Sequence, residues 1–289
     1  MKRIIAILAA ILAALSCEDK VNLPESSPQI VVEGWIEEGG NPVVIVTTSV
    51  PVNETLTDLS ELQNHVVNWA KVTVSDGEEE IVLTGQRNDN YFPPYIYTTV
   101  FMTGKAGRKY DLKVEYSNRT VTASTTIPAP KSLEYIKVTK ASVKDSMYSI
   151  VGGLKDDPRT KDYYKVFTKV RDKDKTYVSS FLGLTDDEIL DETIREIPIN
   201  NGTGVVGERL EAFFTADDFV SVRFCTLDKQ SWTYWNDFEE VQSLASNMLF
   251  PISTDIRSNI KGGLGYWAGY GSSYYKVSIP DSLKLGRVY

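Results

Sequence analysis

The sequence predicts an all-β protein with one amphipathic helix, arranged as two consecutive β-sandwich-like domains at residues 28–130 and 131–289. Apolar and polar residues alternate strictly over residues 110–116, which places one face of a strand on a core and the other in water. Turn signals such as the Asp-Gly pair at residues 76–77 separate the apolar runs. The Pro-Ala-Pro segment at residues 128–130 then interrupts the pattern, as expected at a domain boundary.

The first domain carries about seven predicted strands in roughly one hundred residues, a density that is typical of a β-sandwich. Each strand is rich in β-branched or aromatic residues and ends at a turn. Between the second and third strands, Leu56, Leu59 and Leu62 are spaced by three, which predicts a short helix or an ordered loop. The predicted strands are residues 29–37, 43–48, 71–75, 81–83, 95–103, 110–116 and 121–128.

The second domain repeats this β character less regularly and adds the helix, at about residues 229–248. Asp228 is its expected N-cap, and apolar residues recur every three to four positions after it. This stripe is aromatic, and packing against a sheet explains it better than ligand stacking does. Residues 185–188 match a capping box, which predicts the start of a short acidic helix. The predicted strands are residues 133–143, 148–154, 163–171, 177–182, 210–214, 219–227 and 274–279.

The N-terminus has the order of a secretory signal that ends at a lipidated cysteine. Lys2 and Arg3 form a basic head, and residues 4–15 form an apolar run that is too short to span a bilayer. Ser16 then precedes Cys17. We therefore expect a signal peptide that is cleaved between Ser16 and Cys17, with the lipid attached to the Cys17 thiol.

The charge balance restricts the partners of the protein. The chain has 31 basic and 39 acidic residues, and cleavage after Ser16 removes two basic ones, so the mature balance is 29 − 39 = −10. An acidic surface argues against a nucleic-acid partner and against adsorption to anionic lipid. We expect membrane attachment through the acyl chains alone, across a polar tether at residues 17–27.

The sequence offers little catalytic chemistry. His65 is the only histidine, so a Ser-His-Asp or Cys-His arrangement would have to use it, and its position between two strands favours a loop bystander. The histidine count excludes a histidine-rich zinc site. Cys225 lies in an apolar run and is expected to be a buried, inert thiol. We expect no catalytic residue, no metal and no cofactor apart from the covalent lipid on Cys17.

The glycine-rich and aromatic segment at residues 262–275 is the most suggestive candidate for binding. Glycine allows close backbone approach, and rigid aromatic rings suit stacking on a sugar or a peptide. Tyr266, Trp267, Tyr270 and Tyr274 are therefore candidate contacts for a ligand or a partner. The structural alternative is a glycine-kinked strand that closes a small barrel or sandwich.

Five segments resemble, in the same order, a Bacteroidota lipoprotein family of unknown function, the domain of unknown function 4249 (DUF4249). They are residues 30–36, 70–77, 107–114, 258–260 and 262–270. The resemblance implies a surface-exposed or periplasm-facing lipoprotein with an immunoglobulin-like or transthyretin-like first domain, often encoded beside TonB-dependent transporters. It brings no catalytic residue. Glu18 and Asp19 resemble the acidic export tag of surface lipoproteins in this phylum.

These observations favour a non-catalytic lipoprotein of the outer membrane, at the cell surface or on the periplasmic side. Its expected role is to bind a partner or a nutrient as an accessory to a TonB-dependent transporter. Two alternatives stay open. A fimbrial or adhesive subunit would need a removable strand and an open groove, and the tail after Pro280 is short for this. A cell-surface hydrolase such as a glycosidase would need two carboxylates roughly 5–10 Å apart in a cleft.

Overall fold

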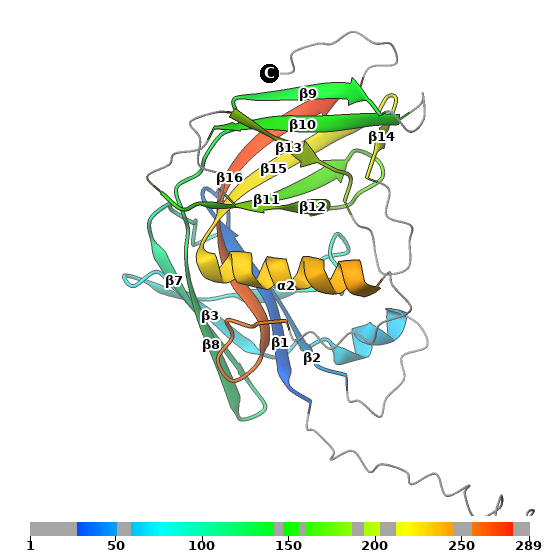
Figure 1. The fold of residues 1–289 in the computed structure, drawn as a ribbon. Coiled ribbons are helices and arrows are strands. Elements are labelled where there is room, and N and C mark those ends of the chain that lie inside the picture. The colour runs from blue at the N-terminus through cyan, green and yellow to red at the C-terminus, as the bar shows by residue number, and fades with distance from the viewer. Residues whose placement is uncertain are drawn as a thin grey trace, which may run out of the picture.

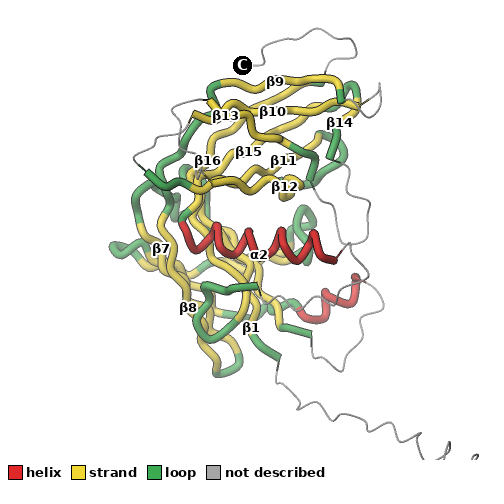
Figure 2. The backbone as a smooth tube through the Cα atoms, viewed as in Figure 1, coloured by secondary structure: helices red, strands yellow, loops and turns green. Residues whose placement is uncertain are grey.

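The computed structural model describes residues 28–50, 59–141, 147–155, 160–186, 194–202, 212–245 and 256–279. The predicted signal peptide, the tether, the lipidated Cys17 and the export residues Glu18 and Asp19 lie outside these residues. Within them the chain is mostly β-strand with one α-helix, so the all-β prediction is confirmed (Figure 2). No helix of the described part has the length and apolar composition needed to cross a bilayer.

One eight-stranded sheet, called here the central sheet, joins both halves of the chain (Figure 1). Its order is β12-β11-β15-β16-β1-β2-β6-β5. β1 and β16 pair in parallel, and the other neighbours are antiparallel. The strands are β1 (Ile30–Glu37), β2 (Val43–Thr48), β5 (Thr84–Arg87), β6 (Tyr95–Thr98), β11 (Tyr163–Val170), β12 (Val178–Asp186), β15 (Phe219–Leu227) and β16 (Leu264–Ser278).

A four-stranded sheet of order β4-β3-β7-β8 packs on the β1 and β2 part of the central sheet. A hydrophobic core, called here the first core, lies between these two sheets. The alternation of β7 places Tyr110, Leu112 and Val114 in it, where they meet Val32 and Val44 of the central sheet. This is the sandwich that the alternating pattern predicts. Its strands are β3 (Lys71–Ser75), β4 (Glu80–Val82), β7 (Lys109–Tyr116) and β8 (Arg119–Thr126).

A second four-stranded sheet packs on the β11 and β15 part of the central sheet. Its order is β13-β10-β14, and β9 also pairs with β10. Ile150 and Phe214 from this sheet meet Tyr164 and Phe224 in the second core. Its strands are β9 (Tyr135–Lys140), β10 (Met147–Lys155), β13 (Ile194–Ile199) and β14 (Phe214–Thr215).

The long strand β16 distributes its side chains over both faces of the central sheet. Trp267 packs in the first core and Val277 in the second, so its odd-numbered residues face the two smaller sheets. Tyr266 and Tyr270 lie on the opposite face, against helix α2 (Lys229–Ala245), which crosses the sheet in Figure 1. The two sandwich units therefore share one sheet.

Glycines permit the close contact between β1 and β16. A Cβ at Gly34 would lie 2.9 Å from Cε3 of Trp267, its partner in the parallel register. Gly265 has a φ of 101°, and a Cβ there would lie 1.9 Å from the carbonyl oxygen of Val32. A larger residue at either position would push the strand or the indole out of place.

The predicted division at residue 130 stays a prediction, because a shared sheet does not test whether either half folds alone. Ile260 and Trp267 lie far beyond that boundary in sequence and still belong to the first core. The short helix expected from the leucine spacing is the 3-10 helix η1 (Leu59–His65).

Helix α2 begins where the sequence predicts. Oδ1 of Asp228 accepts a hydrogen bond of 2.7 Å from the backbone N–H of Ser231, which confirms the N-cap. Its Oδ2 accepts a second hydrogen bond of 3.0 Å from Oγ1 of Thr125 on β8, so the cap also ties the helix to the first unit. The last three positions of the predicted helix, residues 246–248, lie outside the described residues.

Three predicted elements need correction, and the predictions also miss strands β5 and β13. Thr185 and Asp186, the first two residues of the predicted capping box, end strand β12 and pair with β11, while the rest of the predicted helix lies outside the described residues. The strand predicted at residues 95–103 ends at Thr98, where its pairing with β2 and β5 stops. Strand β13 is not predicted, because its charged residues and Pro198 obscure the alternation. The strand predicted at residues 274–279 is only the end of β16.

Candidate functional site

A cleft of about 1180 Å³, called here the aromatic cleft, opens on the α2 face of the central sheet. Side chains from β1, β2, β11, β15 and β16 line its floor. Trp235, Phe238 and Gln242 of α2 line one part of its wall, and the loops at residues 88–92 and 173–177 complete the rim. The cleft therefore uses strands from both halves of the chain.

Six aromatic side chains of the sheet and the helix line the cleft. The Trp235 ring centroid lies 5.4 Å from that of Phe167 and 5.6 Å from that of Tyr266. Nε1 of Trp235 donates a hydrogen bond of 3.1 Å to the Tyr270 hydroxyl. Rings held in this way present a rigid surface that suits stacking on a ligand. The six are Trp35, Phe167, Trp235, Phe238, Tyr266 and Tyr270.

The four aromatic residues that the sequence predicts as contacts lie in three different environments. Tyr266 and Tyr270 line the cleft, and burial raises the pKa of both phenols above the ordinary value, which keeps them neutral. Tyr274 is 52 % exposed, and its ring centroid lies 6.0 Å from that of Tyr177 at the rim. Trp267 is fully buried, so its prediction as a contact is wrong. Its odd position on β16 turns the indole into the first core, where Nε1 donates to the Tyr110 carbonyl at 3.0 Å.

A buried arginine lies at the floor of the cleft. Arg223 of β15 is only 7 % exposed, and its Nη1 lies 3.5 Å from Oε2 of Glu37 on β1. The same Glu37 oxygen accepts a shorter hydrogen bond of 2.7 Å from Ser272. Sγ of Cys225 lies 3.5 Å from the Ser272 hydroxyl, and burial raises the pKa of this thiol to about 11. The prediction of a buried Cys225 is confirmed.

Three aromatic rings surround the guanidinium of Arg223. Its Cζ lies 4.3 Å from the ring centroid of Phe167, 5.1 Å from that of Tyr177 and 5.6 Å from that of Tyr270. Such stacking holds the planar cation in one orientation and keeps water from its faces.

Two glutamates of β1, Glu33 and Glu37, project into the cleft. Tyr266 donates a hydrogen bond of 3.2 Å to Glu33, and the surrounding cleft walls raise the pKa of that carboxyl by burial. Its side chain still reaches solvent through the opening. Because a strand rises about 3.3 Å per residue, the Cα atoms of the two glutamates lie about 13 Å apart.

Charged contacts fix helix α2 over the sheet. The ammonium of Lys165, fully buried on β11, pairs with Glu239 of α2 and lies 4.9 Å from the ring centroid of Trp235. Burial lowers the pKa of Lys165, and the carboxylate of Glu239 opposes this effect. Asp237 is held by Arg257, whose Nη2 lies 2.6 Å from Oδ1 and lowers the pKa of that carboxyl. These pairs keep the aromatic wall of the cleft in place.

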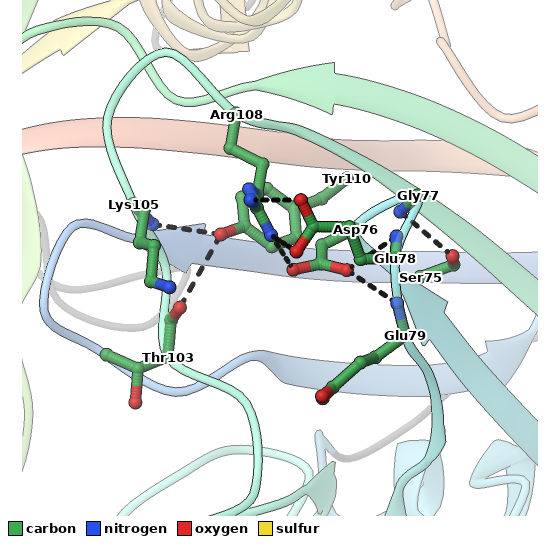
Figure 3. Close-up of polar contacts among 9 residues, drawn as sticks. All are labelled: Ser75, Asp76, Gly77, Glu78, Glu79, Thr103, Lys105, Arg108 and Tyr110. Atoms are coloured by element: carbon green, nitrogen blue, oxygen red, sulfur yellow. Dashed lines mark hydrogen bonds and ion pairs between the residues drawn. The ribbon is translucent and has the colours of Figure 1, made fainter.

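A second charged cluster lies in the first unit, outside the cleft lining (Figure 3). Arg108 pairs with Asp76 and with Glu78, the latter at 2.8 Å. Oδ1 of Asp76 also accepts hydrogen bonds from the backbone N–H groups of Glu78 and Glu79 at 3.1 and 2.9 Å. The backbone bond from Glu79 is the main cause that lowers the pKa of Asp76 to about 2, and Arg108 adds to it. The cluster joins two turns and has a structural role.

The remaining predicted chemistry lies elsewhere. His65 ends helix η1, where Nδ1 lies 3.3 Å from the Thr48 hydroxyl, and it does not line the cleft. Over the part of the chain that the structure describes, His, Cys, Asp and Glu side chains form no group of three that could hold a metal ion.

Sequence reasoning does not identify Trp35, Glu33 or Arg223 as cleft residues. The sequence gives little indication that these residues line a cleft, because each lies in a strand whose alternating pattern is explained equally well by a solvent-exposed face. Glu33 and Trp35 are two positions apart in β1, and this spacing is the one available hint that they share a face.

Comparisons with known proteins agree with the sequence resemblance. The comparison with curated proteins finds no match. One family model, Domain of unknown function (DUF4249), matches residues 18–276, a range that contains every strand and helix described above except the last two residues of β16. The chain therefore belongs to the DUF4249 family.

Proposed function

We propose that this chain is a non-catalytic binding protein, anchored by lipid to the outer membrane and displayed at the cell surface. It holds a ligand in the aromatic cleft and serves as an accessory to a TonB-dependent nutrient transporter.

The observation that carries the binding role is the composition of the cleft. Exposed and buried aromatic rings stand beside a buried arginine and two glutamates in a space of about 1180 Å³. Ligand sites combine apolar ring surfaces with a few fixed polar groups in this way. The anchor rests on the N-terminal sequence pattern, and the transporter partner rests on the family resemblance.

The binding role is tested on full-length protein purified from its own envelope. Native mass spectrometry is expected to detect a bound small molecule, which Trp35→Ala loses because the substitution removes a cleft ring. Trp69→Ala is the matched control, since Trp69 is 88 % exposed and does not line the cleft. Equal retention of the molecule in both variants would contradict a role for the cleft.

The anchor is tested by replacing the lipidated thiol. Cys17→Ser is expected to release the protein from the envelope fraction and to change its mass by the acyl groups. Cys225→Ser, which changes the buried cysteine, is expected to leave fractionation unchanged. Unaltered fractionation of Cys17→Ser would refute the anchor.

The accessory role is tested by affinity purification from detergent-solubilised outer membrane. We expect a TonB-dependent transporter to be recovered with the wild-type protein. Recovery of no transporter component would count decisively against this role and would leave the ligand-binding test unaffected.

A further inference from the structure

The guanidinium of Arg223 has an unfilled edge. Among the described residues its single hydrogen bond joins Nη1 to Glu37, at the long distance of 3.5 Å. Within the part of the chain that the structure describes, Nε is buried without a hydrogen-bond partner and Nη2 makes no hydrogen bond. Nε and Nη2 form one edge of the planar guanidinium, so no acceptor of the described residues meets that complete edge.

This arrangement is energetically unfavourable without a further acceptor. A buried charge is costly unless it is paired and hydrogen-bonded, and a buried donor without a partner calls for an explanation. Glu37 offsets the cost of burying the Arg223 charge only in part, because its Oε2 also accepts the closer hydrogen bond of 2.7 Å from the Ser272 hydroxyl. An acceptor that comes from outside the chain would complete the site.

The geometry of the free edge indicates which kind of acceptor fits it. The two parallel N–H groups of a guanidinium edge match the two oxygens of a carboxylate, which gives a bidentate and charge-assisted pair. A doubly charged phosphate fits less well, because Glu33 and Glu37 project into the same cleft and repel it.

The side chains around the free edge indicate what the rest of the ligand is. Trp35 and Tyr91 line the cleft with their ring centroids 6.0 Å apart, and Tyr177 stands over the guanidinium at the rim. Rigid aromatic faces beside a cation accommodate a flat, apolar ring that carries an acidic group.

We propose that the aromatic cleft binds a small organic acid, whose carboxylate pairs with the free edge of Arg223 while its ring stacks on the aromatic side chains. This inference rests on the proposed function, since it names the ligand class of the same cleft.

The test uses two probes of nearly the same shape, phenylacetate and its neutral amide, phenylacetamide. Isothermal titration calorimetry of the full-length protein in detergent at pH 7 and low salt is expected to show at least tenfold tighter binding of phenylacetate. Arg223→Lys keeps the charge but removes the two-pronged edge, and is expected to weaken phenylacetate by tenfold or more without changing phenylacetamide. Arg195→Lys is the matched control, since Arg195 is exposed on β13 and does not line the cleft.

A second variant keeps the test valid if Arg223→Lys folds poorly. Glu37→Gln leaves Arg223 intact and removes the carboxylate that competes for it, so phenylacetate is expected to bind severalfold more tightly. Equal affinity for the two probes, or phenylacetate binding that neither variant alters, would overturn the carboxylate assignment. If both probes bound equally and Trp35→Ala abolished both, the proposed cleft function would stand while this inference failed.

Discussion

Trp267 offers a direct test of the conclusion that the C-terminal strand completes the first core. The indole is fully buried among residues of β1, β2 and β7, although β16 lies at the other end of the sequence. Trp267→Phe keeps an aromatic ring at this position and removes the pyrrole part of the indole. We expect the protein to fold and to lose stability.

The size of the loss follows from two contacts. Phenylalanine lacks roughly two buried ring carbons, worth about 0.8 kcal/mol each. It also lacks the Nε1 donor that binds the Tyr110 carbonyl at 3.0 Å, which is worth about 1 kcal/mol. The free energy of unfolding should therefore fall by about 2.5 kcal/mol.

Urea denaturation of the full-length protein, followed by circular dichroism, measures this change. Trp69→Phe is the matched control, because the same chemical change at an 88 % exposed side chain is expected to alter stability by less than about 0.5 kcal/mol. A loss below about 1 kcal/mol in Trp267→Phe would refute the reasoning. A shift confined to one of two separate transitions would show that the shared sheet does not couple the two units.

Three further predictions concern the charged contacts. Asp228→Ala removes the N-cap of α2 and should lower the free energy of unfolding by about 1 kcal/mol in urea denaturation, whereas Glu240→Ala on the exposed helix face should have little effect. Lys165→Met leaves Glu239 without its buried partner and should lower the free energy of unfolding by about 3 kcal/mol. Adding Glu239→Gln should restore most of this stability. An equal loss in the single and double variants would contradict the pairing. Hydrogen bonds from its turn lower the pKa of Asp76 to about 2. The contribution of the ionised carboxylate to folding stability is therefore complete above about pH 4 and is lost as the pH falls towards 2. The stability difference between wild type and Asp76→Asn should therefore shrink over that range, and a difference independent of pH would disprove the assignment.

Much of the secondary structure is determined locally and can be predicted. Strands such as β3 and β15 match their predicted bounds, because period-two alternation bounded by turns needs no distant partner. The N-cap of α2 is predicted for the same reason, since Asp228 and Ser231 are three positions apart. Strand β13 shows the limit of this reasoning, because its place in the sheet depends on pairing with β10 and its own pattern is irregular.

The site could be predicted only in part. The aromatic segment of β16 identifies Tyr266 and Tyr270, which line the cleft, and also Trp267, which does not. A strand sends successive side chains to opposite faces, so a run of aromatic residues always contains both kinds. Which face becomes a cleft depends on what covers it.

The sequence by itself determined that this chain is an all-β protein with a single capped helix, because alternation, turns and caps act between neighbouring residues. Only the tertiary structure decided that β16 returns to pair with β1, that both units share one sheet, and that Arg223 meets Glu37 at the floor of a cleft. Those contacts join residues far apart in the chain. They follow from which faces of the sheets bury against each other, and no local pattern contains that information.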